Sequence, residues 1–391
     1  MSTLKVDAIR HNNATSDAIT TAADGTCTAR ITGVTGGGAL SHRNKARNGA
    51  MRISQRGTTF SPTTSDMYLI DGWMTQHGSS GNLDCTVTQS TDAPAGFTKS
   101  LKITPDSTNT PSGSQNGMLA QRLEGQDLQD LAFGTSDAKT MTVSWYAKTS
   151  ATGAGNYTVK VEYNNGTNNY AVNKLFAFTT TWTRYTYTIP ATGTATSVGP
   201  VDSNALGFRI EYHLFAGPDD VHSQFTQWTV NPSPTYKVIS GQKNFMDNTN
   251  NELYITGLQI EVGDTATTFE HKRFSDELRD CQRYFQKSYN YDDAVGSSGV
   301  QGWFQWRRDG GNRPHIPLLT SMRSTPTFLA YNYVGGTAGQ FRNASNGTNH
   351  AQGSVNVIGQ NIVSFDAGAT GWNQIGTGEV GFMYYSLESE L

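Results

Sequence analysis

Apolar and polar side chains alternate with a period of two over much of the chain between residues 45 and 270. Residues 157–163 read Tyr-Thr-Val-Lys-Val-Glu-Tyr, and Asn164-Asn165-Gly166 follows as a turn signal. The same alternation recurs in several further segments, which are residues 141–147, 206–212 and 253–262. Successive side chains of a strand point to opposite faces of its sheet, so each segment offers one face to a core. Repeated strands without helical periods between them predict a mainly β fold, an antiparallel β-sandwich with long polar loops.

One segment has a helical pattern instead. Residues 275–289 carry apolar side chains at helical spacing, with Leu278, Cys281 and Phe285 on one face. Ser275 is suited to cap the first turn, and the two acidic residues that follow it favour the positive end of the helix dipole. We therefore predict a single short helix between two β regions.

These patterns divide the chain into four parts. Residues 1–44 are small and polar and hold too few large apolar side chains for a core. We expect this segment to become ordered only by docking or by oligomerisation, and a loose tail is the alternative. Residues 45–272 form the predicted sandwich, residues 273–302 the helix and a linker, and residues 303–391 a smaller β domain rich in aromatic side chains.

Composition changes this picture mainly by what it excludes. Charged residues make up 16% of the 391 residues, aromatic residues make up 10%, and Gly occurs 41 times. This composition argues against a helical bundle, a coiled coil and a disordered chain. A net charge of −3 provides no field that would hold nucleic acid. No apolar run approaches the ~20 residues that cross a bilayer, so we expect no membrane insertion.

Two further features indicate where the chain is made. The first residues lack the apolar core of a signal peptide. Cys27, Cys85 and Cys281 lie far apart, which is typical of free thiols in a reducing cytosol and not of a disulfide framework or a zinc site. We expect synthesis and folding in the cytoplasm of a cell.

The sequence contains no persuasive catalytic arrangement. We find no GxSxG, HExxH or GxxxxGK[ST] pattern, and no GxGxxG pattern after a strand. Adjacent acids occur at 219–220 and 292–293, but neighbours on an extended strand point apart, so we interpret them as turn or loop residues. We expect no cofactor. We consider a structural Ca²⁺, for which Asp66, Asp71 and Glu261 are the candidate ligands.

Aromatic rings combined with amide and charged groups are the chemistry that binds sugars. A flat ring covers the apolar face of a pyranose, while polar side chains hydrogen-bond its hydroxyl groups. The C-terminal region contains this mixture. The ligand-binding candidates there are Trp303, Trp306, Arg307, Tyr331, Tyr333 and Trp372. For each of them the alternative is a place in the core or in a subunit interface, because a small β domain also needs aromatic side chains inside.

Several motifs lie at the start of the predicted sandwich, which are residues 47–51 (Arg-Asn-Gly-Ala-Met), 55–58 (Gln-Arg-Gly-Thr) and 71–73 (Asp-Gly-Trp) together with Tyr68. They resemble the opening of a carbohydrate-binding-module-like jelly-roll domain of bacteriophage tail fibres and other virion proteins. Gly72 departs from the pattern, because an Arg is usual at this position. The closing signature of the domain is similar to three segments, which are residues 253–263, 266–271 and 278–285.

The two ends of the chain resemble fibre proteins as well. Residues 2–9 (Ser-Thr-Leu-Lys-Val-Asp-Ala-Ile) look like the first residues of short tail fibres from marine cyanobacterial phages. Residues 322–327 and 387–391 are similar to the terminal domain that often follows the jelly roll.

The resemblance implies a homotrimeric virion structural protein with a role in host adhesion. Its N-terminal segment would attach to other tail or capsid proteins, its sandwich would act as a spacer, and its C-terminal tip would bind a host cell-surface glycan without catalysis. In such a trimer the Leu278, Cys281 and Phe285 face would pack around the threefold axis. Two alternatives are a purely structural capsid or neck appendage and a polysaccharide depolymerase or esterase with a site shared between subunits.

Overall fold

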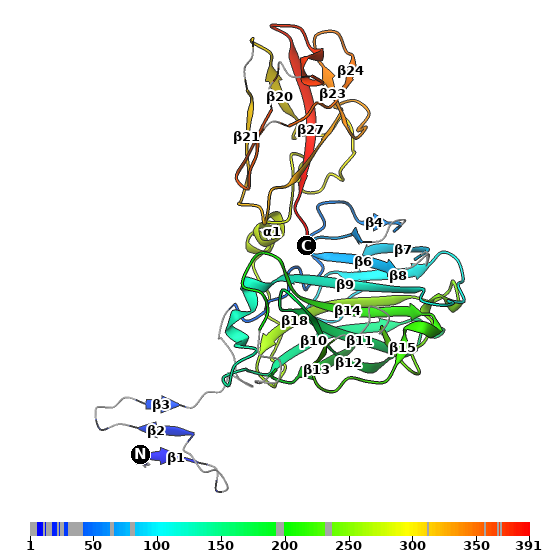
Figure 1. Cartoon of the computed structure of the whole chain (residues 1–391), viewed down its shortest axis with the longest axis vertical. Coiled ribbons are helices and arrows are strands. Elements are labelled where there is room, and N and C mark those ends of the chain that lie inside the picture. Colours follow the sequence, from blue (N-terminus) through cyan, green and yellow to red (C-terminus); the bar gives the residue numbers. More distant parts are fainter. Residues whose placement is uncertain are drawn as a thin grey trace.

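Two antiparallel sheets form the sandwich of the computed structural model (Figure 1). The six-stranded sheet consists, in spatial order, of β13 (Thr183–Ile189), β10 (Met141–Thr149), β18 (Leu253–Val262), β8 (Ser100–Pro105), β7 (Cys85–Ser90) and β4 (Thr59–Phe60). The seven-stranded sheet consists of β16 (Thr229–Val230), β12 (Asn169–Phe178), β11 (Gly155–Asn164), β14 (Leu206–Ala216), β9 (Asn116–Glu124), β6 (Trp73–Gly78) and β5 (Met67–Tyr68). The predicted mainly β, antiparallel jelly-roll sandwich is confirmed.

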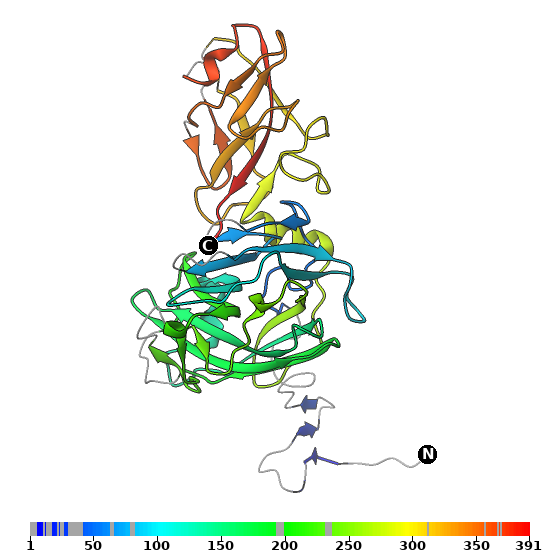
Figure 2. The same cartoon turned by 90° about the vertical axis from the view of Figure 1, so that its right-hand side faces the viewer.

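The structure describes residues 6–10, 12, 18–21, 23, 27–29, 42–62, 66–78, 83–192, 199–230, 237–310, 313–355, 357–365, 367 and 370–391. Most of the predicted attachment segment, residues 1–44, therefore lies outside the described residues. Its described parts include three short strands that pair in order, β1 (Ala8–Ile9), β2 (Ile19–Thr21) and β3 (Cys27–Ala29). These strands lie beyond the sandwich on the side opposite the C-terminal domain (Figures 1 and 2).

The core of the sandwich forms where the apolar faces of the two sheets meet. Trp145 of β10 and Tyr212 of β14 come from different sheets and pack edge to face, with ring centroids 5.4 Å apart. Both side chains are buried, as is Trp73 of β6. Burying one large side chain of this kind contributes about 2–3 kcal/mol, so the period-two alternation of the sequence directly supplies the energy of the sandwich.

The helix is shorter than the sequence predicts. Helix α1 covers Phe274–Gln282, and its N-cap is Arg273, so Ser275 lies inside the first turn and does not cap it. The helix ends early because β19 (Phe285–Lys287) pairs with β27 (Val380–Glu388). Cys281 and Phe285 are buried within the single chain. The expectation that they pack around a threefold axis is therefore wrong.

The C-terminal domain is built around β27. This strand pairs with β19, β20 (Phe304–Arg307), β22 (Thr327–Tyr331) and β23 (Gln340–Asn343). The other strands are β24 (Asn349–Ala351), which pairs with β23, and a separate sheet of β21 (His315–Pro317), β26 (Ile362–Ser364) and β25 (Val357–Ile358). The C-terminal sheet thus includes a strand from the 273–302 region, and the domain projects from one end of the sandwich (Figures 1 and 2).

A buried ionic contact joins the two domains. The carboxylate of Glu390 lies 3.0 Å from the guanidinium group of Arg56 and 3.4 Å from that of Arg47, and all three side chains are largely buried. Arg56 also contacts Glu388 at 3.2 Å and lies 3.9 Å from the ring centroid of Phe285. Burial opposes the charge of Arg56, but the two carboxylates more than offset it and raise the pKa of the guanidinium group.

Hydrogen bonds extend this joint on both sides. The backbone N–H and the Nε2 amide of Gln55 both donate to Asp71 at 2.7 Å, and Nε2 also donates to the carbonyl of Phe285 at 2.9 Å. The hydroxyl group of Tyr68 donates to a backbone oxygen of Leu391. Motif residues that carry the resemblance therefore hold the C-terminal domain in a fixed direction on the sandwich.

Candidate functional site

Three of the six predicted ligand-binding residues belong to the interior. Trp306 is 4% exposed, Trp372 is fully buried, and their rings pack edge to face 5.7 Å apart in the core of the C-terminal domain. Tyr331 is 9% exposed because the 290–302 loop covers it, and its hydroxyl group lies 3.2 Å from that of Ser386. As placed here, these three side chains do not reach a ligand on the surface. They are corrections to the predicted set.

The other three predicted residues keep exposed surface. Trp303 is 37% exposed, Tyr333 is partly exposed, and Arg307 is exposed and pairs with Asp309 at 3.2 Å. The rings of Trp303 and Tyr333 contact each other edge to face with centroids 5.3 Å apart. A ligand role for these three residues stays a prediction.

Strand register decides which other residues join them. In β20, Trp306 points into the core, so Gln305 and Arg307 lie on the opposite, outer face of the sheet. Gln305 is directly opposite Phe382 of β27, and Phe382 is directly opposite Arg342 of β23. The next strand continues the row, because Arg342 is paired with Asn349 of β24. One line across four strands therefore presents an amide, a ring, a guanidinium group and a second amide.

We name this surface the outer-face patch and define it by Trp303, Gln305, Tyr333, Arg342 and Phe382. Tyr333 connects its two parts, because its ring lies 5.3 Å from that of Trp303 and 5.8 Å from that of Phe382. Gln305 is exposed, and the two phenyl rings and Arg342 are partly exposed. The patch combines apolar rings with polar groups at its edges, which is the arrangement that binds a pyranose.

A ladder of buried tyrosines supports the patch from one side. The ring of Tyr333 stacks on Tyr384 at 6.0 Å, and Tyr384 stacks on Tyr289 at 4.3 Å. The hydroxyl group of Tyr384 donates to the carbonyl of Val300 at 2.5 Å, which ties the covering loop to the sheet. Burial raises the pKa of Tyr384 and of Tyr289, so both hydroxyl groups stay protonated. This packing restricts Tyr333 before any ligand arrives.

Sequence reasoning missed three members of the patch. Almost 80 residues separate Gln305 from Phe382 in the sequence, and Arg342 lies between them. Only the pairing of β20 and β23 with β27 brings the three residues into one row. A weak signal was present, because Gln305 alternates with the apolar residues 304 and 306 and must therefore face away from the core.

Two acidic side chains on the sandwich belong to a buried cluster of charged residues. Glu162 of β11 and Glu211 of β14 lie on the outer side of the seven-stranded sheet, and both are buried. Arg209 contacts Glu162 at 2.7 Å and Glu211 at 2.5 Å, and Lys160 contacts Glu162 at 2.7 Å. Cations therefore bind both carboxylates, which leaves neither of them open to a glycosidic bond.

The pKa of Glu211 is consistent with a structural role. Burial favours the neutral form, but the adjacent Arg209 and Lys160 outweigh it and hold the pKa of Glu211 well below its usual range. A general acid must carry a proton near neutral pH. Glu211 stays ionised and cannot supply one.

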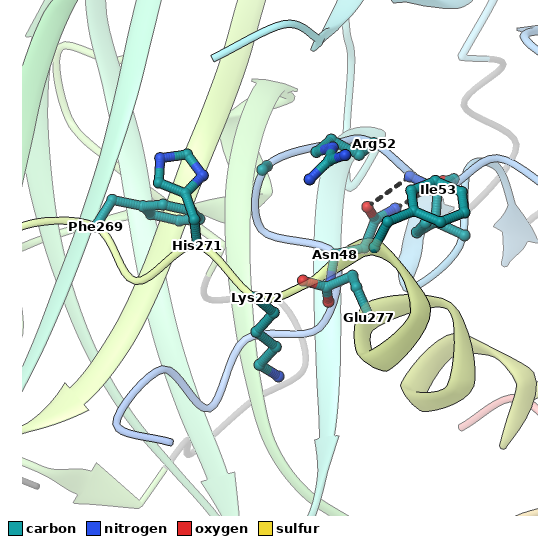
Figure 3. Close-up of a pocket in the computed structure, with 9 residues that line it drawn as sticks. Asn48, Arg52, Ile53, Phe269, His271, Lys272 and Glu277 are labelled. Atoms are coloured by element: carbon teal, nitrogen blue, oxygen red, sulfur yellow. Dashed lines mark hydrogen bonds between the residues drawn. The ribbon is translucent and has the colours of Figure 1, made fainter. Parts of the chain in front are cut away.

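Two hollows lie near helix α1. Figure 3 shows the smaller one, where Glu277 of α1 and Asn48 face each other and the backbone N–H of Ile53 donates to Asn48 at 2.9 Å. Its volume of about 10 Å³ holds at most one water molecule. The larger cleft, of about 360 Å³, is lined by Lys45, Arg283 and other residues that already pair with acidic neighbours. The smaller hollow is too small for a sugar ring.

The proposed calcium ligands do not converge. Asp71 accepts two hydrogen bonds from Gln55, Asp66 lies 3.5 Å from Arg122, and Glu261 accepts from both the amide and the hydroxyl group of Thr267. Within the described residues, no group of three or more His, Cys, Asp or Glu side chains is placed to hold a metal ion. Among the same residues, no helix has the length and apolar character needed to cross a membrane.

No protein-family model and no curated protein matches the chain. Solved structures with similar parts include the enzymatically active domain of tailspike protein 4 of bacteriophage CBA120, with 12% sequence identity and a TM-score of 0.30. That match covers 56% of this chain and 21% of the tailspike chain. The family 11 carbohydrate-binding module of the Clostridium thermocellum cellulase Lic26A-Cel5E matches with 9% identity and a TM-score of 0.27, over 55% of this chain and 98% of the module.

The CBM22-1 xylan-binding domain of Paenibacillus barcinonensis Xyn10C is a further example. It has 13% identity and a TM-score of 0.26, over 54% of this chain and 99% of the domain. The fold assignment rests on the strand pairing of the chain itself.

Proposed function

We propose that this chain is a non-catalytic virion fibre protein that binds a host cell-surface glycan through the outer-face patch. The N-terminal segment attaches to other tail or capsid proteins, and the sandwich acts as a rigid spacer. The chain is made in the host cytoplasm and becomes part of the virion as a homotrimer. The sequence resemblance to phage fibres supports the attachment and the trimer.

The observation that carries the glycan proposal is the patch itself. It combines three partly exposed aromatic rings with an amide and a guanidinium group on one sheet face. The strand β27 runs from the patch to the joint, and Phe382 precedes Glu388 by six residues, which places the patch roughly 20 Å from the joint. The rings therefore lie on the projecting domain, away from the sandwich.

Trimer formation would make weak sites sufficient. Linking three sites raises the apparent affinity by roughly 10²–10⁴ through effective concentration alone.

The test is binding of the full chain to an array of bacterial surface polysaccharides, with Trp303→Ala and Phe382→Ala as site variants. We expect each variant to weaken binding at least about tenfold, since each removes a ring that stacks on the sugar. Trp182→Ala is the matched control, because Trp182 is a partly exposed ring on the sandwich. Its Nε1–H donates a hydrogen bond to Asp92.

Three results would contradict the proposal. Equal binding by the site variants and the control would remove the patch from recognition. Release of reducing ends from a bound polysaccharide would show an enzyme and would favour the depolymerase alternative. Absence of binding to any polysaccharide or host cell would favour the structural appendage.

A further inference from the structure

Arg342 is the one arginine of the outer-face patch, and its guanidinium group is only partly used. Nη1 donates to Asn349 Oδ1 at 3.0 Å. Within the described residues, no carboxylate lies within 4.0 Å of Arg342, and no protein acceptor binds Nε or Nη2. Nε–H and Nη2–H point along one edge of the planar group, so the hydrogen bond to Asn349 leaves free the two parallel donors that bind an anion.

The surroundings of Arg342 do not neutralise it. Arg307, on the same face, is paired with Asp309 at 3.2 Å, so this pair adds no net charge. The carboxylate of Glu379, at the turn before β27, accepts from Asn343 Nδ2 at 2.7 Å and from the backbone N–H of Gly376 at 2.5 Å. These hydrogen bonds lower the pKa of Glu379, so its carboxylate stays ionised, and they hold it at the turn, outside the five residues of the patch. The patch therefore carries one excess positive charge next to its aromatic rings.

The position of Arg342 brings its charge close to a sugar ring that stacks on Phe382. Arg342 and Phe382 are direct partners across β23 and β27, so their Cβ atoms are separated by about 5 Å. A pyranose that covers the Phe382 ring would hold its ring substituents within reach of the guanidinium edge. On the other side of Phe382, the exposed amide of Gln305 is placed to bind a hydroxyl group.

We propose that the ligand of the outer-face patch is an acidic glycan, whose pyranose stacks on Phe382 and Tyr333 and whose anionic group binds the Nε–Nη2 edge of Arg342. This inference rests on the proposed glycan function and names its ligand class. A planar carboxylate matches the two parallel N–H donors, and a sulfate ester offers the same pair of acceptor oxygens.

The experiment compares ligands that differ only in charge. The full chain is titrated with polygalacturonate and with its methyl-esterified form, and in parallel with dextran sulfate and dextran. We expect each anionic polymer to bind at least tenfold more tightly than its neutral counterpart, and we expect this preference to shrink as the salt concentration rises from 50 to 500 mM, about the range over which screening becomes strong. The uronic acid and sulfate arms distinguish the two sources of the anion.

Arg342→Gln removes the charge and keeps a hydrogen-bonding amide. We expect it to abolish the preference for each anionic polymer over its neutral counterpart. Arg342→Lys retains the charge without the fork and should restore part of the preference. Arg313→Gln is the matched control, because it removes one exposed arginine of the same domain next to a different sheet.

The outcomes separate the inference from the function on which it rests. Equal binding of anionic and neutral polymers, unchanged in Arg342→Gln, would overturn the acidic ligand and leave the glycan function standing. A preference lost equally in Arg313→Gln would also overturn it, since general charge would then be the cause. If none of the polymers binds and Phe382→Ala instead changes the oligomeric state, the patch is a subunit interface and both proposals are wrong.

Discussion

Buried charged residues on the outer side of the seven-stranded sheet are stabilised by partners on neighbouring strands. His213 is fully buried, and its Nε2 lies 3.0 Å from Glu211 Oε2. Lys160 and Arg209 contact the carboxylates of the same cluster, while Lys237 lies close enough for its charge to act on His213 and Glu211. Removing one member of such a cluster leaves a buried charge without its partner. The free-energy cost of that charge exceeds the stabilisation that the intact cluster provides.

The pH dependence of stability should reveal His213. Burial lowers the pKa of His213 below 6.5, although Glu211 opposes this shift. Between its folded pKa and 6.5 the unfolded chain binds more protons than the folded chain, so the free energy of unfolding should fall as the pH decreases below about 6.5. Urea unfolding at a series of pH values from 7.5 to 5 measures this slope. In His213→Gln the slope should be smaller, whereas His315→Gln, which removes an exposed imidazole, should keep it. An unchanged slope in His213→Gln would contradict the assignment.

At the scale of elements, the segment of the opening motif that contains Gly49 packs closely against β18, the main strand of the closing signature. The backbone N–H of Leu258 in β18 donates to the carbonyl of Gly49 at 3.0 Å, and Asn44 Nδ2 donates to the carbonyl of Leu258 at 3.2 Å. A Cβ atom at Gly49 would lie 2.1 Å from the carbonyl oxygen of Leu258. The glycine of this motif is therefore required by a close backbone approach.

Gly49→Ala should separate these two elements. Since the obstacle is backbone and not a flexible side chain, we expect a loss of about 1–3 kcal/mol in the free energy of unfolding. Gly359→Ala is the control, because its added Cβ would make only an ordinary contact of 3.7 Å with Ile362. Chemical denaturation of both variants provides the comparison, and equal stability of the two would refute this explanation of the motif.

At the scale of the whole molecule, the joint determines how the two domains act together. Glu390 lies between Arg47 and Arg56, and burial raises its pKa despite these two cations. Tyr284 adds to the joint, because the guanidinium carbon of Arg47 lies 3.5 Å from the centroid of its ring. The contacts give the projecting domain a fixed direction, which a surface-binding protein needs if several copies are to engage at once.

Arg56→Ala should loosen this joint. It leaves Glu390 and Glu388 without their shared partner, and breaking a buried pair costs roughly 3 kcal/mol. We expect calorimetry to resolve separate unfolding of the two domains and small-angle scattering to show a larger maximum dimension. Lys243→Ala, which breaks an exposed pair with Asp247, should change neither measurement. Wild-type behaviour of Arg56→Ala would show that the joint is held by other contacts.

The proposed trimer is tested by mass in solution. Light scattering of the full chain should give three times the chain mass of 42.4 kDa. We expect this because the fibre resemblance implies a trimer and because single protein–sugar sites are weak without avidity. A mass equal to one chain would contradict it.

Much of the fold could be predicted because strands carry their own signal. The alternation in residues 157–163 and 253–262 corresponds to β11 and β18, since one face of each strand meets the apolar core between the sheets and needs apolar side chains there. The helix was predicted too long, because the pairing of residues 285–287 with β27 overrides local helical spacing. Local patterns report which side chains need burial, while partners distant in the sequence decide the backbone that buries them.

The candidate site shows the same division. The sequence alone indicated a mainly β protein whose C-terminal region contains the types of side chain that bind sugars. Only the tertiary structure decided that Trp303 and Tyr333 stay at the surface while Trp306 and Trp372 fill the core. Only the tertiary structure brought Gln305, Phe382 and Arg342 into one row. The physical reason is that the composition of a strand specifies two faces, whereas the strand's neighbours determine which face meets water and which residues lie beside it.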